Sequence, residues 1–489
     1  MGRYIALLLL MLNVYAGFSL INDGLFHPDV VHLAQSVEKT YATGILQPAH
    51  KGRYGSVIVA SIIYLPFFLL GHNADFAVRF SGVLFHALSV VMLFYFVRIL
   101  LKETLPAFFA ALFLSFTPFY LSPNTYGKEH GMSLFFFLLS LYALSRGVQG
   151  KSYMLVALSS FLLAFSISIK ESMIVGVPLF YLLFFSPAVT VSPLRVVISR
   201  DKINVTTACA VFVPFLLTMV FLGIWYLGDE IHRALFIKDY SSTYFVGYAH
   251  FLKNQYALYD LALSIPAVLF LVAGIGLIMM VKRRESFLAL FLVCWSALGL
   301  YFANTSTYTA RFLDIPIIPL YVFAGYALHS IYKRFKWLAA AIVLYSVMHM
   351  TQVAMPLLMF RHEFNGPKQF ALYVQKKTEA NAVIIAVDNG AFIEYYGKRK
   401  VAYPPVNNLS AMPGFIDTIE LYVAEGIPVY CITSAFFYRP NAVRGAIQSH
   451  FAVKKTGASL IEGFHLADLY SQVYRESLFR LTPKKAGRG

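Results

Sequence analysis

Charge and cysteine are both scarce in this chain. Only 13% of its 489 residues are Asp, Glu, Lys or Arg, whereas 58% are hydrophobic and 45 are Phe. The three cysteines, Cys209, Cys294 and Cys431, have no paired spacing, so they favour neither a disulfide framework nor a metal site. A mean hydropathy of +0.65 is too high for a soluble globular protein of this length. The composition predicts a mainly α-helical, multi-spanning membrane protein.

Acidic residues are also few, with 24 Asp and Glu against 40 Lys and Arg. An excess of positive charge is typical of nucleic-acid-binding proteins, but here no basic stripe is interleaved with aromatic residues. Most basic residues instead form short clusters between apolar runs, where they act as topology signals. We therefore expect membrane lipids, and no nucleic acid, as partners.

Eleven apolar runs are candidates to cross about 30 Å of hydrocarbon as helices. They cover residues 4–21, 79–101, 104–121, 131–146, 153–169, 172–186, 205–227, 259–281, 286–302, 312–332 and 337–358. The first run follows Arg3 and has the length of a signal sequence as well as of a span. Because Gly17-Phe18-Ser19 is a poor cleavage site, we expect an uncleaved first span.

One further apolar run, Tyr54–Leu70, is interrupted by Pro66. If this run does not cross, five basic clusters in the later loops all lie on the side of Arg3; if it crosses, all five lie on the opposite side. The positive-inside rule favours the first arrangement, with about eleven spans and a cytoplasmic N-terminus. Residues 22–78 then form a large outer loop, in which Val30–Tyr41 and Tyr54–Leu70 are helices on the membrane face.

The first outer loop gathers several of the scarce charges. Asp23, Asp29, Lys51 and Arg53 lie within residues 22–53 of this loop, together with three histidines. Asp29 follows Pro28 at an expected helix start, where an acidic residue is commonly a cap. A solvated loop between two spans is the other ordinary explanation for such a group of charges.

Three further charged residues interrupt apolar sequence on the same predicted outer face: Glu129, Lys170 and Arg311. Glu129 precedes an apolar helix, where an acid complements the helix dipole, and Lys170 fits a tight turn between spans. Two carboxylates on one membrane face also suit proton abstraction from an acceptor hydroxyl. The cations at 51, 53, 170 and 311 suit the binding of a phosphate leaving group.

After Phe360 the composition becomes that of a soluble domain. Helical patterns at 367–377, 391–397 and 416–426 alternate with short strand patterns at 382–388 and 428–433. This alternation predicts a small α/β domain over residues 361–489, on the outer face. No glycine-rich phosphate loop follows its strands, so a nucleotide site is not indicated.

The order of several motifs resembles that of the GT-C glycosyltransferases, in particular the protein O-mannosyltransferases and the lipid A aminoarabinose transferases. His27-Pro28-Asp29 is similar to the first acidic motif of that family, although Val30 stands in place of a second acid. EHGMSLFF (129–136) resembles the second acidic motif. The segments at 52–71, 168–180 and 309–325 resemble the family's basic segment, its lysine motif and its arginine and proline segment.

The resemblance covers about the first 335 residues and implies a catalytic GT-C domain over residues 1–360. It implies the transfer of a sugar, with inversion, from a polyprenyl-phosphate donor to an acceptor protein, lipid or glycan on the outer face. Asp29 is then the expected base, with Asp23 in reserve, and Glu129 is the second carboxylate. The residues expected to hold the donor phosphate are Lys51, Arg53, Lys170 and Arg311. No metal-ligand motif is present, and the need for a divalent metal or another cofactor stays open.

Two other function classes stay open. A transporter or lipid flippase also has many helices, but it more often carries charges near the bilayer midplane and an internal repeat. The sequence shows neither feature. The third class is a non-catalytic scaffold that presents the outer domain to its partners.

Overall fold

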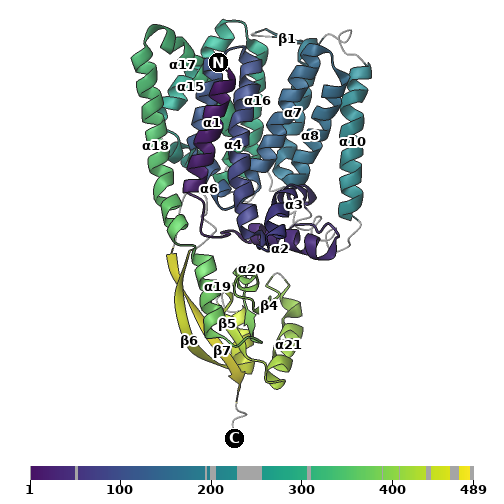
Figure 1. Cartoon of the computed structure of the whole chain (residues 1–489), viewed down its shortest axis with the longest axis vertical. Coiled ribbons are helices and arrows are strands. Elements are labelled where there is room, and N and C mark those ends of the chain that lie inside the picture. Colours follow the sequence, from purple (N-terminus) through teal and green to yellow (C-terminus); the bar gives the residue numbers. More distant parts are fainter. Residues whose placement is uncertain are drawn as a thin grey trace.

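The protein is an integral membrane protein built as a helical bundle with a smaller α/β domain below one end of it (Figure 1). The computed structural model describes residues 2–49, 53–192, 195–198, 205–227, 256–305, 310–387, 389–406, 408–436, 442–462 and 473–484. The N-terminus lies at the opposite end of the bundle from the α/β domain.

Long apolar helices make up the bundle. They are α1 (Gly2–Ser19), α4 (Ala74–Leu101), α5 (Thr104–Phe116), α6 (Pro118–Thr125), α7 (His130–Gly150), α8 (Tyr153–Ile169), α9 (Gly176–Phe184), α10 (Val205–Leu227), α14 (Tyr256–Ser264), α15 (Ala267–Lys282), α16 (Ser286–Thr305), α17 (Asp314–Arg334) and α18 (Lys336–Glu363). Short 3-10 helices at Glu171–Val175 (η2), Ser186–Ala188 (η3) and Ala310–Leu313 (η6) join some of them. A hairpin of β1 (Val189–Ser192) and β2 (Arg195–Ile198), which was not predicted from the sequence, follows α9.

Each of the eleven runs expected to span is helical in its described part. Among the described residues, six helices are long and apolar enough to cross a membrane, or up to eight if each bent pair counts as one span. The other runs form shorter apolar helices. The number of eleven crossings therefore stays a prediction.

Two of the predicted spans are broken. Thr117 separates α5 from α6, whose first residue is Pro118. The two helices are bent by 57°, because proline cannot donate a backbone hydrogen bond inside a helix. The bend brings the backbone of α6 against α4 at Gly82, where a Cβ atom would collide with the Asn124 carbonyl. A second break at Pro266 sets α14 and α15 at 105°. Glycine at position 82 is thus required for the contact between α4 and α6.

A chain of neutral polar groups links helices inside the bundle. Asn13 of α1 donates to Ser115 of α5 at 3.0 Å, and its carbonyl oxygen lies 3.1 Å from His86 Nε2 of α4. His86 Nδ1 lies 3.5 Å from the Asn124 amide nitrogen, and the Asn124 oxygen accepts from the Gly131 N–H at 2.9 Å. All of these residues except Gly131 are buried amides, hydroxyls or imidazole. These polar groups, buried among the helices, thus satisfy one another without formal charge.

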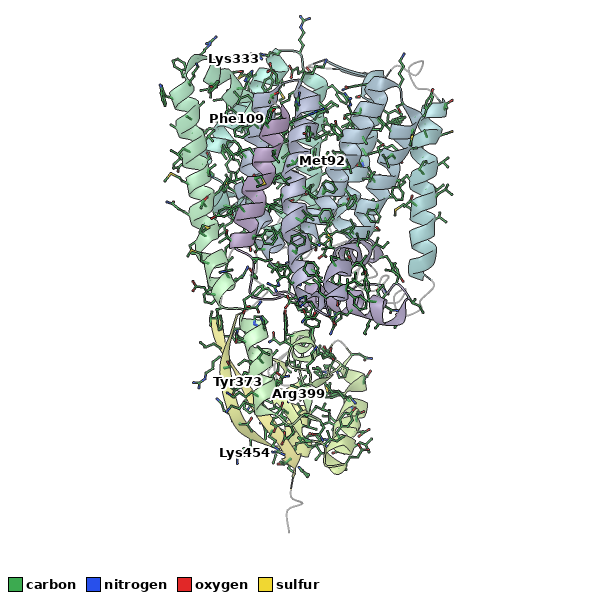
Figure 2. The ribbon with its side chains drawn as sticks, viewed as in Figure 1. Met92, Phe109, Lys333, Tyr373, Arg399 and Lys454 are labelled. Carbon is green, nitrogen blue, oxygen red and sulfur yellow. The ribbon has the colours of Figure 1, made fainter. Side chains whose placement is uncertain are left out.

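Basic residues lie at the end of the bundle that carries the N-terminus. Arg98, in the last turn of α4, packs against Gly2. Lys333, in the last turn of α17, lies at the same end (Figure 2). The first loop, with helices α2 (Pro28–Thr43) and α3 (Tyr54–Leu69), lies at the other end (Figure 1). Both loop helices were predicted from the sequence; the identity of the outer face stays a prediction.

The C-terminal domain contains a five-stranded sheet of order β4-β3-β5-β7-β6. Its strands are β3 (Val383–Ile385), β4 (Lys400–Ala402), β5 (Val429–Ile432), β6 (Phe451–Glu462) and β7 (Val473–Pro483). The helices are α19 (Gly366–Lys377), α20 (Gly390–Tyr395), α21 (Met412–Ala424), α22 (Thr433–Phe436) and α23 (Ala442–His450), with η7 at Leu409–Ala411. β4, β3 and β5 are parallel, whereas β7 is antiparallel to β5 and to β6. The predicted α/β alternation is therefore present.

The first loop and the C-terminal domain share one hydrophobic core. Apolar residues of α2 and α3, such as Val30 and Val57, belong to the same buried cluster as Phe370 and Ile384 of the C-terminal domain. Polar contacts reinforce this core: the Tyr396 hydroxyl accepts from the Leu25 N–H at 2.8 Å. The bundle has a separate core of its own. The first loop is therefore held between the bundle and the C-terminal domain.

Candidate functional site

The first acidic motif forms the start of α2. His27 is the N-cap, and its Nδ1 accepts from the Asp29 N–H at 3.2 Å; Pro28 lies in the first turn. The Asp29 carboxylate turns toward cations instead. Its Oδ2 lies 2.5 Å from Lys128 Nζ and 3.6 Å from Arg53 Nη1. The capping role that an acid commonly has at a helix start is thus taken here by the histidine.

Arg53 joins three carboxylates from different parts of the chain. It is the N-cap of α3 and only 6% exposed. Its Nε and Nη2 donate to the two carboxylate oxygens of Glu171 at 2.8 and 2.7 Å, and its Nη1 donates to Glu129. Asp29 is the third carboxylate. The planar guanidinium suits this position because it presents several donors in a fixed geometry.

Lys128 and Glu129 precede α7 and are both buried. Lys128 Nζ donates to Asp29 and lies 3.2 Å from His27 Nδ1. Glu129 occupies the N-cap position of α7 but makes no side-chain capping bond; besides Arg53, it contacts Lys170 Nζ at 3.4 Å. Neither carboxylate of the two predicted acidic motifs is thus a simple helix cap. We call Asp29, Arg53, Lys128, Glu129, Lys170 and Glu171 the charged cluster.

Lys170 and Arg311 meet at one aromatic ring. Lys170 lies between α8 and η2, and its Nζ is 5.7 Å from the centre of the Phe312 ring. The Arg311 guanidinium of η6 is 5.8 Å from the same centre. A cation over an aromatic face is attracted by the ring quadrupole. The Phe312 ring thus brings Arg311 close to Lys170, which is a member of the charged cluster.

His130 adds a buried pair next to the charged cluster. Its Nδ1 lies 2.8 Å from Asp314 Oδ2 at the start of α17, and both side chains are almost fully buried. Glu129 and His130 are adjacent in sequence, but Glu129 contacts Arg53 whereas His130 contacts Asp314. This pair ties the start of α7 to the start of α17.

Burial and neighbouring charges set the protonation states of the charged cluster. Burial lowers the pKa of Lys128 to about 8, against the opposing effect of Asp29 and Glu129. Burial alone raises the pKa of Glu129, but Lys128, Lys170 and Arg53 together lower it to about 2. Burial and the Lys128 charge hold the pKa of His27 well below its usual value. At neutral pH the carboxylate of Glu129 is therefore ionised, Lys128 is mostly protonated and His27 is neutral.

The structure does not bring every predicted residue into the charged cluster. Lys51 lies outside the described residues. Asp23, the reserve base, pairs with Lys368 of the C-terminal domain at 2.9 Å, and its side chain is 44% exposed. Asp29, Glu129, Arg53 and Lys170 do come together, as predicted, with Arg311 beside them.

Sequence reasoning missed Lys128 and Glu171 as members of the charged cluster. Both are adjacent in sequence to predicted residues, in the pairs Lys128-Glu129 and Lys170-Glu171. The signal that was present is the occurrence of opposite charges side by side within otherwise apolar sequence. Such pairs place one charge of each sign at the same end of a helix, where each can partner a different side chain.

The charged cluster, as it stands, does not fit a divalent metal. Its carboxylates already face the positive side chains of Arg53, Lys128 and Lys170. Within the described part of the chain, no group of three or more His, Cys, Asp or Glu side chains is placed to hold a metal ion. A divalent metal ion beside these three cationic side chains would be repelled by them.

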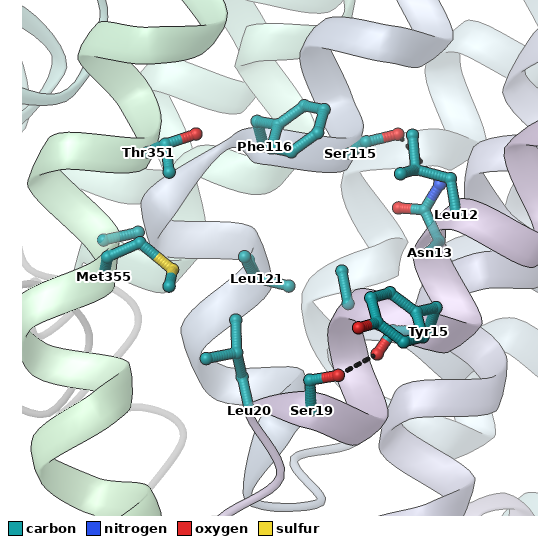
Figure 3. Close-up of a pocket in the computed structure, with 12 residues that line it drawn as sticks. Leu12, Asn13, Tyr15, Ser19, Leu20, Ser115, Phe116, Leu121, Thr351 and Met355 are labelled. Carbon is teal, nitrogen blue, oxygen red and sulfur yellow. Dashed lines mark hydrogen bonds between the residues drawn. The ribbon is translucent and has the colours of Figure 1, made fainter.

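A cavity lies elsewhere in the bundle. It has a volume of about 280 Å³ and is enclosed by α1, the break between α5 and α6, and α18 (Figure 3). Its lining is mostly apolar, with Asn13 and Ser115 of the neutral polar chain at one side. None of the residues of the charged cluster lines it. The cavity therefore does not coincide with the charged cluster.

Comparison with solved structures identifies the fold. ArnT from Cupriavidus metallidurans, solved with undecaprenyl phosphate, superposes with a TM-score of 0.61 at 13% identity, over 98% of this chain and 97% of that one. The chain has the GT-C fold. The Archaeoglobus fulgidus oligosaccharyltransferase, solved with zinc and sulfate, matches with a TM-score of 0.59 at 11% identity, over 92% of this chain and 72% of that one.

A third GT-C structure, the mycobacterial arabinofuranosyltransferase AftD, gives a TM-score of 0.59 at 13% identity, over 99% of this chain and 40% of that one. Residues 56–218 match the family model described as dolichyl-phosphate-mannose-protein mannosyltransferase. This match contains Glu129 and Lys170 but begins just after Arg53. No protein in the search of curated proteins matches the chain. The predicted GT-C fold class, with its helical bundle and small C-terminal sheet, is confirmed.

Proposed function

We propose that this protein is a membrane glycosyltransferase that transfers a sugar from a polyprenyl-phosphate donor to an acceptor. The observation that carries the proposal is the charged cluster: two carboxylates of the predicted acidic motifs, Asp29 and Glu129, meet cations at one end of a GT-C bundle. The match to a mannosyltransferase family model and the polyprenyl phosphate in the ArnT structure support this donor class.

The reaction needs one base and a stabilised leaving group. Asp29 takes the proton of the acceptor hydroxyl or amine, whose oxygen or nitrogen forms a bond to the anomeric carbon of the sugar. The bond between that carbon and the phosphate oxygen breaks, and the electron pair leaves with the phosphate. Attack opposite to the leaving group inverts the anomeric configuration. No acid is needed, because a phosphate is a good leaving group once cations neutralise it.

Two cations of the charged cluster, together with Arg311 beside it, neutralise the leaving phosphate. Lys170 and Arg311 converge on the Phe312 ring, and Arg53 lies one carboxylate away through Glu129. Glu129 bridges Arg53 and Lys170, so it positions both cations. The roles of Asp29 as base and of Lys170, Arg53 and Arg311 as phosphate ligands belong to this proposal, as does Lys51.

The acceptor side and the orientation also belong to the proposal. An acceptor protein, lipid or glycan meets the donor on the outer membrane face, where the first loop and the C-terminal domain (residues 361–489) enclose the site. The shared core of these two parts supports their common location. Single-cysteine labelling of intact cells at exposed positions of α2 and of the C-terminal domain tests this orientation. Labelling of both from the cytoplasmic side only would contradict it.

The neutral polar chain favours an enzyme over a transporter. A transporter places ionised side chains along a path near the bilayer midplane. Here the groups linked through the bundle, from Asn13 to Asn124, are amide, hydroxyl and imidazole groups. The ionised groups of the charged cluster lie at the helix ends.

The experiment that tests the proposal uses purified protein and labelled polyprenyl-phosphate sugars. Asp29→Asn preserves the size of the side chain and removes the base, so transfer should fall by about 10²- to 10⁴-fold while donor binding is retained. Asp23→Asn is the matched control because Asp23 pairs with Lys368 outside the charged cluster. Full activity in Asp29→Asn would contradict the assignment, and loss of activity in Asp23→Asn alone would move the base to Asp23.

A further inference from the structure

Two carboxylates that face one site need a positive partner between them, because like charges in a buried site disfavour joint ionisation. In many enzymes this partner is a divalent metal held by the carboxylates. In the charged cluster, two side chains supply this charge: Arg53 contacts Glu129 and lies 3.6 Å from Asp29, and Lys128 is the cation in closest contact with Asp29. Lys128 is fully buried, and its Nζ donates to Asp29 Oδ2 at 2.5 Å and to His27 Nδ1 at 3.2 Å.

Lys128 also acts on the second carboxylate. Of the cations around Glu129, Lys128 contributes most to lowering its pKa, ahead of Lys170 and Arg53. Lys128 therefore contacts Asp29 and acts on Glu129 through its charge. Carboxylate and imidazole are the groups that Mn²⁺ and Zn²⁺ also bind, and Asp29 and His27 provide one of each around the Lys128 ammonium.

We propose that the Lys128 ammonium is a resident cation that replaces a divalent metal beside Asp29 and His27 and positions Asp29, so that this site works without a metal ion. The expected effect on catalysis rests on the proposed transferase function. The expected effect on metal binding is independent of that function.

The backbone before Lys128 fixes the direction of its side chain. Gly127 has a φ of +90°, a conformation that side-chain-bearing residues rarely adopt, and a Cβ at this position would collide with the backbone of Val78. The Lys128 N–H then donates to the Pro123 carbonyl at 3.0 Å. This turn, packed between α6 and α4, directs Lys128 toward the start of α2. The lysine is therefore positioned by rigid structure and not by a flexible surface loop.

The first experiment measures Mn²⁺ binding to the intact wild-type protein in detergent, by thermal shift and by titration, without any donor. We expect no saturable change in Tm for wild type. A stoichiometric Mn²⁺ site in wild type that Asp29→Asn removes would overturn the proposal. Because no turnover is measured, this result stands whether or not the protein is a transferase.

The second experiment removes the resident cation. Lys128→Ala leaves Asp29 and His27 facing a vacated space, so Mn²⁺ should now raise its Tm in a saturable manner. Lys282→Ala, an exposed lysine at the other end of the bundle, is the control and should show no Mn²⁺ effect. A folded Lys128→Ala that neither binds Mn²⁺ nor differs from wild type in transfer would overturn the proposal. If Lys128→Ala does not fold, the wild-type titration and Lys128→Arg decide.

Transfer activity provides the positioning test. Wild type should keep its activity in a metal chelator, whereas Lys128→Ala should lose about ten- to a hundred-fold and regain part of this with Mn²⁺. Lys128→Arg keeps the charge and should retain more activity than Lys128→Ala. Loss of wild-type activity in chelator, restored by Mn²⁺, would overturn the inference while supporting the transferase. Absence of transfer under every condition would instead contradict the proposed function. The Mn²⁺ titrations of wild type and Lys128→Ala would then test the resident cation by themselves.

Discussion

The charged cluster and the neutral polar chain both bury polar side chains inside the protein, but they compensate for the lost water in different ways. Both bury polar side chains from several helices, and they are neighbours, since Gly131 of the chain follows His130 and Glu129. The chain uses amides and hydroxyls that satisfy one another through hydrogen bonds. The charged cluster uses ionised groups, whose desolvation is costly unless each one is paired. A cheaper neutral solution was available within the same fold, so the retained charges indicate a chemical task.

The largest expected effect comes from removing the central cation. Arg53→Met leaves Glu129 and Glu171 buried without their main partner, and breaking a buried ion pair in this way typically costs about 3 to 5 kcal/mol. We expect a clear loss of Tm in detergent together with loss of transfer. Arg334→Met, at an exposed position in the last turn of α17, is the control and should change Tm little. Equal Tm values for the two variants would show that the charged cluster adds nothing to stability.

The next effect separates phosphate binding from general positive charge. Lys170→Ala should weaken donor binding or transfer by about ten- to a hundred-fold, because a charge-assisted contact contributes about 1.5 to 3 kcal/mol. Neutralising Lys282, Arg283 and Arg284 together should leave transfer unchanged at matched folded concentration. Binding of a polyprenyl phosphate and turnover are measured for both. Similar losses in the two proteins would return Lys170 to the role of an ordinary turn residue.

A variant of the neutral polar chain should affect stability and not chemistry. Asn13→Ala leaves the His86 Nε2 and Ser115 groups without their partner, at a cost of about 1 to 3 kcal/mol for a buried unsatisfied group. Tm should fall, whereas turnover per folded molecule should stay close to wild type. Thr351→Ala, which lines the cavity from α18, is the control with a smaller expected loss. A loss of turnover without a loss of Tm in Asn13→Ala would instead show that the neutral polar chain takes part in the reaction.

The smallest effect is a pH dependence confined to the charged cluster. Lys128 has a pKa lowered to about 8 by burial, so its ammonium is present below that pH and is lost as pH rises through it. The groups facing it are His27, Asp29, Glu129, Arg311 and Lys170. Transfer should therefore decline above about pH 8 in wild type, and Lys128→Arg should lack this decline because arginine stays protonated. An identical alkaline profile in both proteins would assign the decline to another group.

Much of the fold was predictable because apolar length and charge bias are strong signals. The helical runs, the two helices of the first loop and the alternation of the C-terminal domain all follow from periodicity and composition. The convergence of Asp29 and Glu129 on one site was predictable from the order of the spans, although Arg53 joins them. The hairpin at 189–198 was not, since each of its strands has only four residues.

The detailed partners were not predictable, because they depend on the directions of adjacent side chains. Lys128, Glu129 and His130 are consecutive, yet they contact Asp29, Arg53 and Asp314, respectively. The direction of Lys128 depends on the positive φ of Gly127, which periodicity does not reveal. Asp23 lies six residues before Asp29 in sequence, but its partner is Lys368. Closeness in sequence thus predicted which charged residues gather in this region, but it did not predict which of them contact each other.

The core shared by the first loop and the C-terminal domain has a consequence for biosynthesis. Leu25 and Tyr396, joined by a hydrogen bond, are 371 positions apart, so the loop must leave the translocation machinery long before its partner is made. During that interval the first loop lacks its contacts with the C-terminal domain. We expect these helices to rest on the lipid surface until synthesis is almost complete. Assembly of the site is therefore a late step, governed by the order of translation and not by the insertion of the spans.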